Sequence, residues 1–197
     1  ASILTGMLND PDKQIRVAAL KSFICKNRTT DELTGLSLIP DSLFWATLPT
    51  KTKQELVLQL KDKDPEARKA AVSSVCSVGL CDTTFGYTIP DSLLKMIFDA
   101  DRAVCSESID QLNYLGQSGI TPKSIQAVPL MINYLSEANN HGDVLKLARV
   151  LKQMKLSSPS DISLIERLIN LSFKWGSCHN EIATLLKSNP EWAGEAV

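Results

Sequence analysis

Apolar residues recur along this chain every three or four positions, which is the spacing of one buried helix face. Val144, Leu147, Ala148, Leu151 and Met154 follow this spacing, and the stretch 162–171 repeats it. No segment alternates apolar and polar residues with enrichment in β-branched side chains, as a half-buried strand would. The pattern therefore predicts helices and no strands.

The sequence contains an internal repeat. Residues 8–20 and 60–72 align without a gap, and they share a leading leucine, two aspartates, an arginine and an Ala-Ala pair. A third copy at 97–109 keeps both aspartates but has Cys105 in place of the arginine. Because a repeated unit usually sets the whole architecture, this repeat predicts a helical array.

A second repeated string places the other helices. Residues 39–43 and 89–93 are both Ile-Pro-Asp-Ser-Leu, with looser versions at 122–125 and 159–162. Proline followed by Asp or Ser is typical of a helix start, because the first helical turn needs no N–H from proline and gains from a polar cap. The two strings alternate along the chain, which indicates pairs of helices.

The alternation predicts five pairs, each with a leading and a trailing helix. The leading helices are expected at 2–9, 40–60, 90–98, 122–138 and 159–175. The trailing helices are expected at 12–26, 64–79, 101–116, 142–156 and 179–188. The corresponding units are 2–27, 40–80, 90–117, 122–157 and 159–189. Pro49 cannot lie inside an unbroken helix, so the segment 40–60 should kink or split there.

Residues 8–20 resemble the turn and second helix of a HEAT repeat, and residues 60–72 are nearly as similar. The resemblance implies an all-α fold: a right-handed α-α superhelix of about five helix pairs, with trailing helices along the concave side. Armadillo repeats are close relatives with three helices per unit, and the split near Pro49 would suit one. We expect a single repeat domain over 1–197 that is a segment of a longer chain.

The repeated polar residues have structural interpretations. Asp12, Asp64 and Asp101 precede the trailing helices, where a carboxylate accepts hydrogen bonds from unpaired N–H groups. The HEAT resemblance implies that Arg16 and Arg68 reach the aspartate of the next unit, Asp64 or Asp101, and form a ladder. The pairs Ala18-Ala19 and Ala70-Ala71 should allow close helix approach.

Composition and motifs give no sign of chemistry. The chain has 21 basic and 22 acidic residues, so no overall positive field draws it to nucleic acid. No long apolar stretch predicts membrane insertion. An odd number of cysteines without regular spacing favours free buried thiols in the cytoplasm, with the nucleus as an alternative. His141 and His179 fall in predicted turns without triad partners. We therefore expect no enzyme, cofactor, metal site or small-molecule substrate.

These observations favour a scaffold that binds a protein or peptide partner on the concave face. The candidate residues are the outward positions of the trailing helices: Lys13, Val17, Lys21, Glu66, Lys69, Ser73, Ser106, Asp110, Asn113 and Lys146. Two alternatives stay open. One is a nucleic-acid-associated HEAT-like protein of chromatin or DNA repair, which salt-dependent binding to a duplex would reveal. The other is a structural spacer within a larger multidomain protein.

Overall fold

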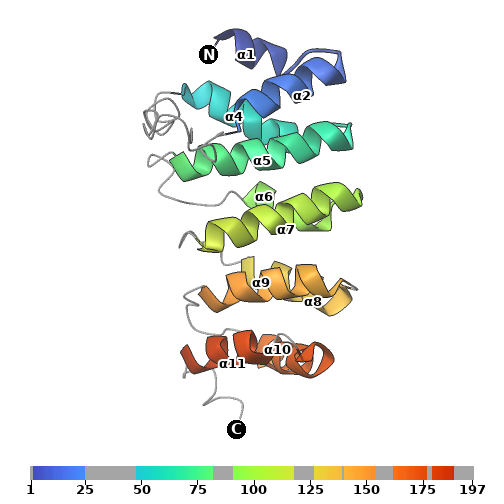
Figure 1. Cartoon of the computed structure of the whole chain (residues 1–197), viewed down its shortest axis with the longest axis vertical. Helices are drawn as coiled ribbons and strands as arrows, with labels where there is room; N and C mark the ends of the chain where they lie inside the picture. Colours follow the sequence, from blue (N-terminus) through green and yellow to red (C-terminus); the bar gives the residue numbers. More distant parts are fainter. Residues whose placement is uncertain are drawn as a thin grey trace, which may run out of the picture. The chain divides into compact units, whose positions relative to one another are not determined.

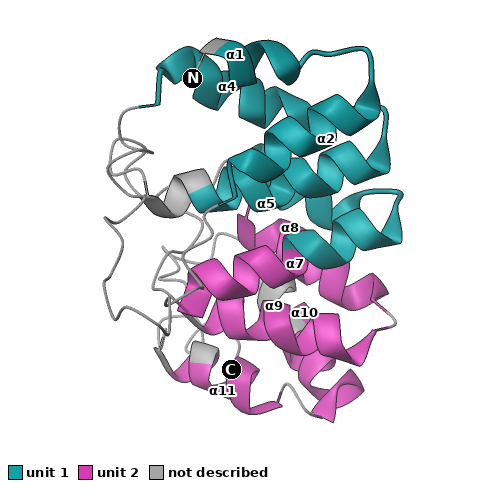
Figure 2. Cartoon of the chain, turned by 45° about the horizontal axis from the view of Figure 1, so that its top comes forward, with its two compact units in different colours: residues 1–108 teal, residues 109–197 magenta. Residues whose placement is uncertain are grey.

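The computed structural model describes residues 2–24, 48–81, 91–117, 127–138, 140–153, 162–176 and 179–188. All regular secondary structure in these ranges is helical (Figure 1). The chain divides into two compact units, Ala1–Ser108 and Ile109–Val197, which Figure 2 shows in two colours. The fold class predicted from the sequence, an all-α helical repeat, is confirmed. The single domain over 1–197, the superhelical handedness and the concave side stay predictions.

The first unit consists of short leading helices and longer trailing helices. In chain order its helices are α1 (Ser2–Met7), α2 (Lys13–Ser22), α4 (Thr50–Leu58), α5 (Pro65–Cys81), α6 (Asp91–Lys95) and the first part of α7 (Arg102–Gln117). A 3₁₀ turn extends α4 over Gln59–Lys61, and another extends α6 over Met96–Phe98. α5 packs on both α2 and α4, and α1 packs on α2. The trailing helices α2 and α5 thus form one layer.

The second unit repeats this two-layer arrangement. Its helices after the end of α7 are α8 (Ala127–Glu137), α9 (His141–Gln153), α10 (Ile162–Lys174) and α11 (His179–Ser188). Within each pair, α8 packs on α9 and α10 on α11. Between pairs, leading helix α8 packs on α10 and trailing helix α9 packs on α11. Buried Val144, Leu147, Ala148 and Leu151 confirm the apolar face predicted for α9.

Each described helix overlaps one segment predicted from the sequence. Pro49 directly precedes α4 with an extended backbone (ψ 140°), so no helix runs through it. Pro129 lies in the first turn of α8, where its missing N–H has no partner to lose. The predicted helical segment before Leu48 falls outside the described residues.

The repeated aspartates and arginines build one turn three times, which we call the turn module. Its first aspartate (Asp10, Asp62, Asp99) accepts a hydrogen bond from the N–H two residues later, at 2.8 Å in each copy. Its second aspartate caps the following helix by accepting from the N–H groups of Gln14, Glu66 and Ala103. The capping role predicted for Asp12, Asp64 and Asp101 is confirmed.

The arginine of one module is bonded to the next, but its partner differs from the predicted one. The Arg16 Nε and Nη2 groups donate to the two carboxylate oxygens of Asp62 at 2.6 and 3.0 Å, not to Asp64. In the next copy, both donor–acceptor distances from Arg68 to Asp99 are 2.8 Å, and the bonds do not go to Asp101. Each aspartate accepts a backbone N–H of its own turn, but only the carboxylate of the first one also accepts from the arginine of the preceding module. We call each arginine–aspartate pair a rung.

Each rung also closes its own turn. Arg16 Nη1 donates to the carbonyls of Asp10 and Pro11 at 2.8 and 3.0 Å, and Arg68 Nη1 repeats this with Asp62 and Lys63. The first rung is almost fully buried, because the Arg16 and Asp62 side chains are 7% and 6% exposed. Such a buried pair is stable only when its hydrogen bonds are satisfied, as they are here.

The alanine pairs are only partly as predicted. Ala19, Ala70 and Ala71 are buried, and they allow the close approach of α2 and α5. Ala18 is exposed, because it lies on the opposite side of α2 from that contact. The Ser74 hydroxyl is completely buried and lies 2.6 Å from the Leu20 carbonyl oxygen, which adds a polar contact between the two helices.

Removal of the two aspartates of one module should have different effects on stability. Asp62→Ala leaves the buried Arg16 guanidinium without its partner, so we expect a loss of about 3–5 kcal/mol in the free energy of unfolding. Asp64→Ala removes a helix cap and an exposed ion pair, so we expect a loss of about 1 kcal/mol. Urea denaturation of both variants measures the difference. Equal losses would contradict the rung.

The rungs should also make stability depend on acid. Burial raises the pKa of Asp62, but the hydrogen bonds from Arg16 and from the Asp64 N–H, together with the charge of Arg16, outweigh burial, so the pKa is lowered. The hydrogen bond from Arg68 lowers the pKa of Asp99 despite its burial. The unfolded-state pKa of Asp is about 3.9. Stability from both carboxylates is therefore complete above that pH and is lost as pH falls through the lower folded-state pKa values.

Urea denaturation between about pH 2 and pH 6 tests this pH dependence. We expect Asp99→Ala to lose less stability on acidification than the wild-type chain, because one of the two linked carboxylates is gone. Identical pH profiles for the two proteins would contradict the linkage.

Candidate partner-binding surface

The trailing helices of the first unit present a charged surface, which we call the α2–α5 face: Lys13, Lys21, Glu66, Lys69 and Ser73. The side chains of Lys13, Lys21 and Glu66 are 52%, 59% and 58% exposed. Lys69 is exposed as well. Five of the residues predicted to bind a partner therefore lie on one layer of helices.

The contacts within the α2–α5 face are weak or incomplete. Lys13 lies 3.3 Å from an Asp64 carboxylate oxygen, and Lys21 lies 3.7 Å from Glu66. Exposed pairs of this kind contribute about 0–1 kcal/mol, so a partner can replace them at little cost. The Lys69 ammonium has no partner within the described part of the chain. These charges are therefore available for recognition.

Ser73 is the exception on this face. Its hydroxyl donates to Glu107 of α7 at 2.5 Å, so it already links α5 to the part of α7 within the first unit. Ser106, the next predicted residue on α7, is half-buried. These two positions form the margin of the surface.

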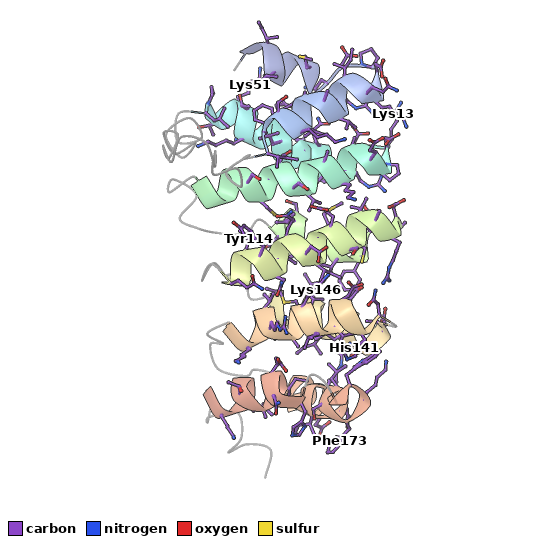
Figure 3. All side chains as sticks on the ribbon, viewed as in Figure 1. Lys13, Lys51, Tyr114, His141, Lys146 and Phe173 are labelled. Carbon is purple, nitrogen blue, oxygen red and sulfur yellow. The ribbon has the colours of Figure 1, made fainter. Side chains whose placement is uncertain are left out.

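The predicted residues of the second unit form a smaller group, which we call the α7–α9 cluster: Asp110, Asn113 and Lys146. The Lys146 ammonium of α9 donates to the Asp110 carboxylate of α7. Figure 3 labels Lys146 on α9 and Tyr114 on α7. Tyr114 directly follows Asn113 in the sequence and is 39% exposed. The structure thus brings residues from two trailing helices together here.

Asn113 contains an unused acceptor. Its side-chain oxygen is buried and has no hydrogen-bond partner. A buried polar atom without a partner destabilises a fold by about 1–3 kcal/mol. Because this oxygen is buried, it is not accessible to a ligand, and the partly exposed Asp110 and Lys146 are the recognition candidates of the second unit.

Val17 was wrongly placed on the surface. It is only 6% exposed and packs in the core of the first unit. Val17 lies between Lys13 and Lys21 around α2, but α2 contacts α5 along a broad side that includes Val17, while the long lysine side chains at either end of the helix stay exposed. Ala18 is exposed where Val17 was expected.

Several contributing residues were missed. Glu107 accepts from Ser73, and Asp62 and Asp99 hold the arginines. The sequence signal for the two aspartates was present, since both aspartates of the motif repeat. The start of the helix after each turn shows which of the two aspartates caps that helix.

The described residues contain no cluster of three or more His, Cys, Asp or Glu side chains that could hold a metal. No helix in the described part of the chain is long and apolar enough to cross a membrane. His141 and His179 are the exposed first residues of α9 and α11, rather than turn residues. The side chains of Cys76 and Cys105 are buried thiols, and burial raises the pKa of the Cys76 thiol.

Comparison with known proteins supports the fold. No protein-family model and no curated protein sequence matches the chain. Among solved structures, it is similar to a chain from a study of the phosphorylation switch that controls the interaction between cadherin and beta-catenin. The TM-score is 0.57 at 14% sequence identity, over 94% of this chain and 36% of that one.

This likeness shows an armadillo-like helical-repeat fold. At this identity it shows the fold alone. The specific assignment to HEAT repeats stays a prediction.

Matched substitutions at neighbouring positions test the assignment of the α2 surface. Val17→Asp places a charge in the core, so we expect it to lower the free energy of unfolding by about 3 kcal/mol or more. Ala18→Asp adds the same charge on the exposed side and should cost about 0.7 kcal/mol through helix propensity. Thermal or urea unfolding measures both. Similar losses would contradict this orientation of α2.

Proposed function

We propose that the chain is a protein-interaction scaffold that binds a protein or peptide partner on its trailing helices. The observation that carries this proposal is the α2–α5 face, where exposed charges of both signs stand on a buried apolar layer. Mixed charge favours a protein surface over a phosphate backbone, because complementary potentials give specificity between proteins.

The α7–α9 cluster supports the same role. Its Lys146–Asp110 pair contributes one charge of each sign, and both side chains are partly exposed.

The structural neighbour supports a binding role more generally. That protein was studied for its interaction with another protein, and its helical-repeat fold resembles this one. We extend the binding role to this chain as a proposal, with the concave side of the repeat array as the binding face. The absence of a recognisable catalytic arrangement in the sequence agrees with a scaffold rather than an enzyme.

The compartment is also a proposal. Two buried thiols, Cys76 and Cys105, favour a reducing environment. We therefore place the binding role in the cytoplasm, with the nucleus as the alternative.

Charge reversal at Lys69 tests the proposed face. We expect Lys69→Glu to release at least one protein that the immobilised wild-type chain retains from a cell extract, because the central unpaired charge changes sign. Lys95→Glu makes the same charge change on exposed α6 and should release none. Quantitative mass spectrometry compares the retained proteins.

The affinity of a protein identified in this way can then be measured by calorimetry. We expect Lys69→Glu to weaken it about tenfold or more. If Lys69→Glu and Lys95→Glu retain every partner equally, the α2–α5 face is not the binding surface.

A further inference from the structure

A groove of about 530 Å³ lies between the turns 8–11 and 58–63 of the first unit. It adjoins the Arg16–Asp62 rung and is built from the turns, whereas the α2–α5 face is built from helix sides. Its volume lies within the range of about 300–1,000 Å³ that is common for binding pockets. None of the residues predicted from the sequence to bind a partner lines it.

The groove has an apolar wall. Leu58, at the end of α4, is 55% exposed, although leucines at neighbouring helix positions such as Leu56 and Leu60 are buried. Pro11 and the buried Leu8 complete this wall. An exposed leucine inside a groove offers contact area to an apolar side chain of a ligand.

Two basic side chains stand on the same groove. Lys61 and Lys63 flank Asp62 in sequence, and both are exposed. Neither ammonium group forms an ion pair within the described residues, whereas Asp62 is fully engaged by Arg16. The groove therefore has two positive charges that form no ion pair with an acidic group of the described ranges.

Asp10 provides a negative counterpart. The equivalent aspartates of the next two turn modules, Asp62 and Asp99, each hold an arginine guanidinium. Asp10 makes the same backbone bond as they do, yet it has no cation bonded to its carboxylate within the described residues. In those two modules the cation is the arginine of the preceding module, which shows that an aspartate at this module position accepts a guanidinium.

We propose that this groove binds a peptide segment that carries an apolar residue together with an arginine and an acidic residue. The apolar side chain lies against Leu58 and Pro11, the carboxylate meets Lys61 and Lys63, and the guanidinium meets Asp10. A simple anion would leave Leu58 uncovered, and a nucleic-acid backbone would meet the Asp10 carboxylate. The inference rests on the protein-binding role proposed above but uses a separate surface.

Fluorescence anisotropy with a defined peptide library tests this proposal. The labelled peptides each contain one leucine, one arginine and one glutamate in all orders, separated by one to three alanines. We expect a subset to bind the wild-type chain saturably. Leu58→Ser and the double variant Lys61→Glu/Lys63→Glu should each weaken that subset about tenfold or more.

Matched controls lie on the same unit but outside the groove. Ile3→Ser changes a 79% exposed apolar residue of α1, and Lys51→Glu reverses an exposed charge on α4, labelled in Figure 3. Both should bind the peptides as the wild type does. Circular dichroism confirms that all variants remain folded.

Three outcomes would overturn the proposal. The first is the absence of saturable binding by any peptide, and the second is equal weakening by groove and control variants. The third is binding that Leu58→Ser does not affect and that free glutamate or phosphate abolishes, which would show an anion patch only. If no peptide binds the groove but Lys69→Glu releases a protein partner, only the groove proposal fails and the proposed function stands. If the peptide experiment and the Lys69→Glu experiment both fail, the proposed function fails as well.

Discussion

The buried arginine of the turn module is the interaction on which the first unit depends. Arg16 is removed from water, and its donors are used by the carbonyls of its own turn and by a carboxylate of the next one. A guanidinium has a fixed planar fork of donors, so these acceptors can satisfy it only in one relative position. The rung therefore sets the register between one repeat and the next, while apolar burial supplies most of the stability.

This constraint ends inside the first unit. The third module has Cys105 where the others have arginine, and its thiol bonds to the Ile97 carbonyl at 3.0 Å instead. The second unit is joined by different polar contacts, such as Arg167 to the Ser136 hydroxyl and Lys174 to the Ser136 carbonyl. The sequence motif fades after the third copy because the interaction that required it is no longer made.

The same division explains where recognition can reside. Residues that form caps and rungs are occupied by the fold, and release of a buried rung would cost much stability. The residues left over are those that do not repeat: Lys69 on α5, the Asp110–Lys146 pair, and Leu58 with its neighbouring lysines. Partner choice in a repeat protein thus depends on positions that the repeat pattern cannot identify.

The sequence by itself determined the helices, the paired order and the capping aspartates, because these follow from local periodicity and from short-range hydrogen bonds. The resemblance of the motif to HEAT repeats also implied that Arg16 and Arg68 bridge to the following module. Only the tertiary structure decided that the acceptors are Asp62 and Asp99, because the choice depends on which carboxylate of a turn lies against the arginine of the preceding module. Likewise, the burial of Val17, the exposure of Ala18 and the groove beside Leu58 depend on how α2 and α4 meet α5, and such contacts join residues far apart in the sequence.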